Sequence, residues 1–156
     1  MFQVETNHAE RMIFLRMAGV LSVDEAHACA AAKEAAVDSL GPPYDHMTLV
    51  DVRGLRLQPQ EIFAIFTNFV ATTRHKSRKV AIVGGEGTAR MQFRRVAERA
   101  PLRDDMRLFT VMAEARDWLV ADDAPKSSQP PSQSPLRPIL PGHPHNGLPG
   151  SHAASA

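Results

Sequence analysis

The sequence has only one cysteine, Cys29, and this scarcity excludes two classes of small protein. A single thiol cannot form a disulfide within the chain, and it cannot supply the paired thiolates of a cysteine-based zinc site. The 7 histidines are scattered and show no metal-ligand spacing. We therefore expect no metal site and no cofactor, and a reducing cytoplasm is the simplest environment for the chain.

Long apolar runs and an excess of one charge are also missing. No stretch approaches the ~18 consecutive apolar residues of a membrane span. Charges at Glu5, Glu10, Arg11 and Arg16 leave the N-terminal segment without the unbroken apolar stretch of a signal peptide. The net charge of +1 gives no bulk attraction to polyanions. No DNA-reading helical motif is evident, so we expect no nucleic-acid partner. We expect a cytoplasmic protein, either free or attached at the periphery of the inner membrane.

The composition changes near residue 124. Eight of the twelve prolines lie at 125–156, together with serines, glycines and few apolar residues. Such a segment cannot bury enough surface to offset its ordering entropy. We therefore expect one folded domain at 1–124 and a disordered tail at 125–156.

Within the first 124 residues, strand-like and helix-like patterns alternate. Ser22 and Glu25 have the spacing of a capping box, and Gly41 suits a left-handed helix end. The patterns predict strands at 2–6, 11–19, 46–52, 79–85 and 105–111, and helices at 22–41, 59–75, 88–100 and 112–122. The order β-β-α-β-α-β-α-β-α predicts an α/β fold, a mixed sheet of about five strands covered by about four helices.

This order, with the segments "LVDVRG", "KVAIVGG" and "MAEARDWL", resembles the STAS superfamily. Within it the chain is most similar to the SpoIIAA-like (STAS/SEC14-type) bacterial proteins, over about residues 2–121. The resemblance implies a STAS-like binding domain over nearly the whole folded part of the chain. Its SEC14-type aspect implies an apolar or lipid-like ligand, and its STAS aspect implies regulatory protein–protein interaction.

The sequence departs from this family at the regulatory site. In phosphorylatable anti-anti-sigma factors, an Asp-Ser pair opens the helix after the third strand, and its serine accepts phosphate. Here that position falls on Pro59 and Gln60, and no serine lies between Ser39 and Ser77. Without an acceptor hydroxyl the charge switch of phosphorylation cannot operate at this position.

Asp51 and Arg53 lie in "LVDVRG", where we expect the third strand to end. A strand-end carboxylate at a switch point is a candidate general base. The neighbouring cation of Arg53 would lower the pKa of Asp51 instead, which favours a structural role. A partner such as His46 or His75 folded against Asp51 would restore the catalytic interpretation.

The predicted helix at 59–75 is unusually apolar. Its core face has helical spacing and consists of Ile62, Ile65, Phe66 and Phe69. Phe63, Thr67 and Val70 occupy the neighbouring sector and widen the apolar surface. The helix is either broadly buried or presents a surface to a ligand, a second subunit or a membrane. The candidate ligand-binding residues are Phe63, Phe66, Thr67 and Val70.

Basic residues concentrate between 74 and 107, in an otherwise neutral domain. Arg90 and Arg94 have i, i+4 spacing, and Arg95 follows them. These three form a candidate basic patch, which is either a solvated face or a contact for anionic lipid headgroups. Phe93 is the one aromatic among them, which argues against stacking on single-stranded nucleic acid.

These observations predict a non-enzymatic binding module. The first hypothesis is binding of an apolar or lipid-like ligand, or of an anionic membrane surface, through the apolar helix and the basic patch. The alternative is a regulatory adaptor that contacts a protein partner or forms a homodimer. Cys29 lies among alanines and is expected to be a small buried residue.

Overall fold

The computed structural model describes residues 1–85, 87–99 and 105–121, which belong to a compact unit, Met1–Asp122. The predicted tail at 125–156 lies outside the described residues.

The predicted order of strands and helices is confirmed. The elements are β1 (Phe2–Asn7), β2 (Met12–Gly19), α1 (Val23–Leu40), β3 (Met47–Leu55), α2 (Gln60–Thr72), β4 (Lys79–Val83), α3 (Thr88–Arg99), β5 (Met106–Phe109) and α4 (Met112–Val120). The strands form one sheet in the order β1-β2-β3-β4-β5. β1 is antiparallel to β2, and each later neighbouring pair is parallel, so the sheet is mixed as expected.

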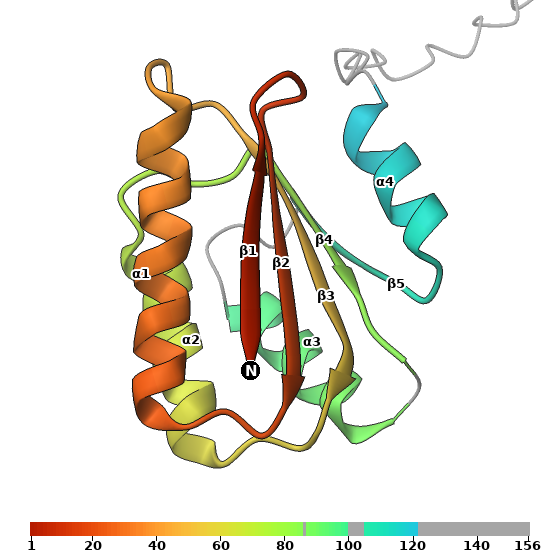
Figure 1. Cartoon of the computed structure of the whole chain (residues 1–156). Coiled ribbons are helices and arrows are strands. Elements are labelled where there is room, and N and C mark those ends of the chain that lie inside the picture. Colours follow the sequence, from red (N-terminus) through yellow and green to blue (C-terminus); the bar gives the residue numbers. More distant parts are fainter. Residues whose placement is uncertain (86, 100–104, 122–156) are drawn as a thin grey trace, which may run out of the picture. The chain divides into compact units, whose positions relative to one another are not determined.

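Helices cover both faces of the sheet. Helices α1, α2 and α3 lie on one side, and α4 lies on the other (Figure 1). Alternate residues of β3 therefore enter different cores: Val50 and Val52 pack towards α1 and α2, whereas Met47 and Leu49 pack towards α4. Since both faces are covered, the central strands contain apolar runs, such as Val80–Val83 in β4, and these runs predicted buried strands.

The ends of α1 show how local sequence sets the boundaries. Ser22 accepts from the backbone N–H of Glu25 at 3.1 Å, and the Glu25 carboxylate accepts from the N–H of Ser22 at 2.9 Å, which confirms the capping box. At the other end Gly41 has φ +65°, but its ψ of 174° is not that of the left-handed helical conformation we expected. Glycine is favoured there by the positive φ alone.

Strand β3 is longer than predicted. Its pairing with β2 resumes after an irregularity between Arg16 and Ala18, and Ala18 pairs with Gly54. A Cβ on Gly54 would lie 3.1 Å from that of Ala18, so this close approach favours glycine. Asp51 and Arg53 consequently lie within the strand, where we had expected its end.

Candidate functional site

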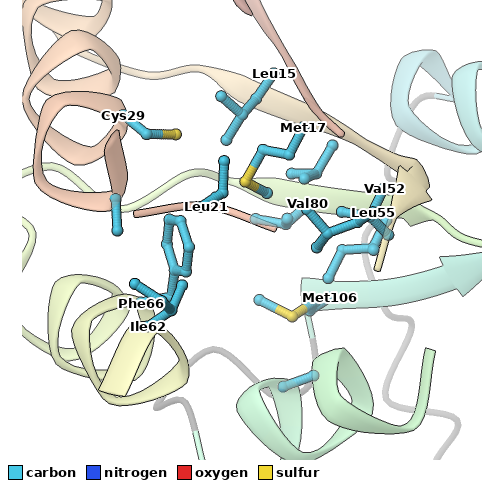
Figure 2. Close-up of a cluster of buried hydrophobic side chains, with 14 residues drawn as sticks. Leu15, Met17, Leu21, Cys29, Val52, Leu55, Ile62, Phe66, Val80 and Met106 are labelled. Carbon is cyan, nitrogen blue, oxygen red and sulfur yellow. The ribbon is translucent and has the colours of Figure 1, made fainter. Parts of the chain in front are cut away.

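An apolar cavity of about 90 Å³ lies between the sheet and helices α1, α2 and α3. Side chains from β2, α1, α2 and β5 point into this part of the interior, among them Met17, Cys29, Phe66 and Met106 (Figure 2). The full lining is Leu15, Met17, Cys29, Ala30, Lys33, Thr48, Val50, Phe66, Phe69, Val70, Thr73, Ser77, Val80, Ile82, Phe93, Val96 and Met106. Thirteen of these seventeen side chains are apolar, and a mainly apolar lining is usual in a site for a small organic ligand.

The two walls of the cavity differ in burial. The sheet residues that line it, such as Val50 and Ile82, are buried. On the helical side, Ala30, Val70 and Thr73 are half-buried. The partly exposed lining residues come from α1, from α2 and the residue after it, and, in the case of Phe93, from α3, so all of them lie on the helical side of the cavity.

Three polar side chains interrupt the apolar lining at one place. Lys33 comes from α1, Thr48 from β3, and Ser77 from the loop before β4, and all three are buried. The hydroxyl oxygens of Thr48 and Ser77 are 2.7 Å apart. The cavity therefore has a polar corner in an otherwise apolar wall.

The His46 ring contacts two members of this polar corner, Lys33 and Ser77. Its Nδ1 lies 2.8 Å from the carbonyl oxygen of Tyr44, so Nδ1 carries the proton and Nε2 accepts. Two donors compete for the single lone pair on Nε2: the Lys33 ammonium at 3.2 Å and the Ser77 hydroxyl at 2.9 Å. Burial lowers the pKa of His46, which keeps the ring neutral at pH 7.

Lys33 is the unusual member of this group. Its side chain is only 5% exposed, and burial lowers its pKa from 10.5 to about 8. Within the described part of the chain, no carboxylate forms an ion pair with Lys33, and Nζ lies 5.8 Å from the ring centre of Phe69. A buried lysine without an anionic partner is rare, because removing an ammonium from water is costly.

Glu34 lies next along α1 but is directed to other partners. One carboxylate oxygen accepts a short hydrogen bond from the Thr73 hydroxyl. The other oxygen, Oε2, is 3.7 Å from Nε of Arg74 and has no hydrogen bond to the described residues. The Glu34 charge acts on Lys33 in the direction that raises the pKa of Lys33, and the larger effect of burial outweighs it.

Only two of the four candidate ligand-binding residues of α2 line the cavity. Phe66 and Val70 line the cavity, and Phe69, which we had assigned to the core face, lines it as well. Phe63 and Thr67 are half-buried and do not line it. The Thr67 hydroxyl donates instead to the backbone carbonyl of Phe63 at 2.9 Å.

Asp51 lies on the opposite face of the sheet from the cavity. Two guanidinium N–H groups of Arg53 donate to its carboxylate at 2.9 Å each, and the backbone N–H of Arg53 donates at 3.1 Å. Nε of Arg16 lies 3.4 Å from Oδ2. These hydrogen bonds with Arg53, above all, hold the pKa of Asp51 below its usual value. A carboxylate held in this way is a poor general base, and His46 is bonded elsewhere.

The basic residues do not gather in one place. Arg90 and Arg94 line the same shallow depression on α3, as their spacing predicted, while Arg95 is exposed outside it. Arg94 also pairs with Glu98 at 3.0 Å. Elsewhere, Arg74 pairs with Asp38, Arg78 pairs with Asp45, and Lys79 donates to backbone carbonyls at the end of α4.

Sequence reasoning missed Lys33, His46 and Ser77 as site residues. A signal was present for Lys33, because the buried face of α1 recurs with helical spacing and includes this lysine: Ala26, Cys29, Lys33, Ala36, Val37 and Leu40. A charged residue within an apolar stripe marks either a paired charge or a site. For His46 and Ser77 the sequence carried no such signal, since they meet only in the folded chain.

Sequence reasoning also missed Gln58, whose hydrogen bonds link three parts of the chain. Its side chain accepts from the N–H of Leu21 and donates to the carbonyls of Gly19 and Arg56, all within 2.9 Å. Its backbone N–H and carbonyl bond the side-chain amide of Gln92 at 3.1 and 3.0 Å. The entry to α2 is therefore fixed to the β2–α1 connection and to α3.

Comparison with solved structures settles the fold. A protein of the DUF3478 family from Shewanella loihica, described as having a SpoIIAA-like fold, superposes with a TM-score of 0.59 at 19% identity, over 76% of this chain and 92% of that one. The chain has the SpoIIAA-like fold. This confirms the predicted STAS-like architecture.

Two anti-sigma factor antagonists share the fold. One, from Mycobacterium paratuberculosis, gives a TM-score of 0.53 at 14% identity, covering 76% of this chain and 92% of that one. The other is SpoIIAA in its unphosphorylated form, with a TM-score of 0.53 at 13% identity, covering 78% of this chain and all of SpoIIAA (100%). No protein-family profile and no curated protein sequence matches the chain. In the described residues, no helix is long and apolar enough to cross a membrane.

Proposed function

We propose that this protein is a non-enzymatic binding module that takes an apolar or lipid-like ligand into the cavity beneath α1 and α2. The observation that carries the proposal is the apolar lining of that cavity, to which Phe66, Phe69 and Val70 of α2 contribute. Each methylene that such a ligand buries contributes about 0.8 kcal/mol to binding.

The size of the cavity restricts the ligand. At about 90 Å³ it is smaller than the roughly 300 to 1,000 Å³ typical of sites for drug-sized molecules. A narrow aliphatic chain fits this space better than a fused ring system. Binding of a longer chain requires α2 to move outward, and only two side chains of α2, Ile62 and Phe66, are fully buried.

The chemistry of the described residues supports binding over catalysis. The Asp51 carboxylate is held by Arg53 on the far face of the sheet. Burial raises the pKa of the Cys29 thiol to about 12, so the nucleophilic thiolate is scarce at neutral pH. The Ser77–His46 pair is buried behind Lys33, and the ring has no carboxylate partner among the described residues.

Native mass spectrometry of the gently purified protein tests the proposal. We expect extra mass on the monomer that disappears on denaturation and extracts into organic solvent. Ala30→Leu adds three carbon atoms to a side chain that lines the cavity, and it should remove the extra mass. Ala31→Leu makes the same change at an exposed position of α1 and should leave it in place. Equal loading of the two variants would contradict the proposal.

A second candidate function is regulatory interaction with a protein partner. Val20 and Leu57 are 53% and 57% exposed, and Gln58 holds their two loops together beside the start of α2. Two proteins of this fold are anti-sigma factor antagonists, and their activity requires a protein partner. A stable complex that is lost in Leu57→Ser but retained in Ala30→Leu would support this function.

Membrane attachment receives less support, because the basic side chains are spread over separate parts of the surface and several of them have partners. Arg74 and Arg78 form ion pairs, and Lys79 bonds the end of α4. Arg90 and Arg94 alone share a depression, on α3. Sedimentation with vesicles rich in anionic lipid tests the remaining contribution of Arg90, Arg94 and Arg95.

A further inference from the structure

At the polar corner of the cavity, the Lys33 ammonium has more N–H groups than hydrogen-bond acceptors among the described residues. The Lys33 ammonium carries three N–H groups, and the Thr48 and Ser77 hydroxyls carry one O–H each. The two hydroxyls are hydrogen-bonded to each other at 2.7 Å, and Lys33 and Ser77 share the single lone pair on Nε2 of His46, so two N–H groups of Lys33 have no acceptor among the described residues. A surplus of buried donors is costly unless acceptors from elsewhere satisfy them.

The charge at the corner is also unbalanced. Lys33 is buried, and none of the described carboxylates pairs with it. Glu34, its neighbour on α1, bonds Thr73 and faces Arg74. The group that completes this corner is therefore an anion with several lone pairs.

The position of the corner identifies the shape of the anion. Lys33, Thr48 and Ser77 line the same cavity as the apolar side chains Phe66, Phe69 and Val70. One molecule can therefore contact both sets only if it joins an anionic head to an aliphatic chain. A lipid with two acyl chains is too bulky for a cavity of about 90 Å³, which favours one chain.

We infer that the ligand is a single-chain aliphatic carboxylate, whose head accepts hydrogen bonds from Lys33 and from one hydroxyl of the Thr48–Ser77 pair. This inference rests on the proposed function and specifies its ligand class. A carboxylate offers about four lone-pair sites, which are enough for the two remaining N–H groups of Lys33 and one hydroxyl. Hydrogen bonds between an ammonium and a carboxylate are roughly twice as strong as neutral ones.

Calorimetric titration with matched probes tests the inference. The purified protein, freed of bound lipid, is titrated at pH 7 with straight-chain carboxylates of six to twelve carbons and with the primary alcohols of the same lengths. We expect a carboxylate of the best-fitting length to bind at least tenfold more tightly than its alcohol. Lys33→Met should remove this preference, and Lys76→Met, at an exposed lysine, should preserve it.

The outcomes separate the two proposals. If alcohols bind as tightly as carboxylates and Lys33→Met changes neither, the cavity binds apolar ligands but the carboxylate inference is overturned. If neither series binds at any length, the proposed function and the inference both fail. The comparison of probes on the unaltered protein stands even if Lys33→Met does not fold.

Discussion

Nζ of Lys33 lies 3.2 Å from Nε2 of His46, a neutral ring, and this contact is the only hydrogen bond of Lys33 within the described residues. A neutral acceptor compensates poorly for the loss of water around an ammonium. The arrangement therefore costs stability in the absence of ligand, and its cost depends on pH.

Replacing this lysine with an apolar side chain should stabilise the ligand-free protein. A pKa lowered from 10.5 to about 8 corresponds to a destabilisation on the order of 3 kcal/mol at pH 7. We expect Lys33→Met to recover much of this free energy of unfolding, as measured by urea denaturation. A loss of stability at pH 7 would show that the ammonium has a partner that compensates its burial.

The difference in free energy of unfolding between Lys33→Met and the unaltered protein should vary with pH in a defined window. Below about pH 8 both states of the unaltered protein hold the Lys33 proton, so the full penalty applies. Between about pH 8 and 10.5 the unfolded chain binds the proton that the folded state has released, so the stability of the unaltered protein rises with pH. Burial lowers the pKa of His46, the ring that faces Lys33, from 6.5, so this ring stays neutral throughout the window. The gap between Lys33→Met and the unaltered protein should therefore close.

Gln58→Leu should destabilise the fold. The change leaves the N–H of Leu21 without its buried acceptor, at a cost of about 1–3 kcal/mol, and removes one of the two donors to the carbonyl of Gly19, which keeps the N–H of Arg56. We expect a drop of about 1–3 kcal/mol in the free energy of unfolding. Gln60→Leu, at an exposed position two residues on, serves as the control and should lie within about 0.5 kcal/mol of the unaltered protein.

Asp51→Asn should weaken the fold and leave ligand binding unchanged. The hydrogen bonds from Arg53 lower the pKa of Asp51, so this carboxylate stabilises the folded state above about pH 4 and ceases to do so as acid protonates it. We expect a loss of about 1–3 kcal/mol at pH 7 that shrinks in acid. The exposed Asp117→Asn is the matched control. A change in ligand loading of the monomer would contradict the assignment of Asp51 to the opposite face.

Cys29 provides a reporter for the opening of the cavity. It is buried against the cavity, and burial raises its pKa to about 12, so alkylation by a neutral reagent should be far slower than in the unfolded chain. A ligand in the cavity should slow the reaction further by covering the thiol. Equal alkylation rates with and without a bound aliphatic ligand would place that ligand elsewhere.

The sequence predicted the fold more completely than the site. Covered strands and amphipathic helices leave a periodic apolar pattern, and the capping residues Ser22 and Glu25 mark where α1 begins. The position of Asp51 was misjudged because Arg53 and Gly54 resemble a turn, and only pairing with β2 shows that the strand continues. Pro59 was placed inside α2, and it precedes the first helical residue.

The polar corner illustrates what a sequence does not display. Lys33, His46 and Ser77 come from α1, the connection before β3 and the connection before β4, and no local pattern relates them. Lys33 alone was detectable, as a charge on the apolar stripe of α1. Helical spacing had placed Phe63 and Val70 in one sector of α2, and only the packing shows that Val70 lines the cavity and Phe63 does not.

The five-stranded sheet also separates two sets of charges. Lys33 and its partners lie on the face covered by α1–α3, whereas Asp51, Arg16 and Arg53 lie on the face of α4, and the two sets share no residue. Substitutions on opposite faces should therefore be additive in free energy. Substitutions in the cavity lining should therefore leave the contribution of the Asp51–Arg53 pair to stability unchanged.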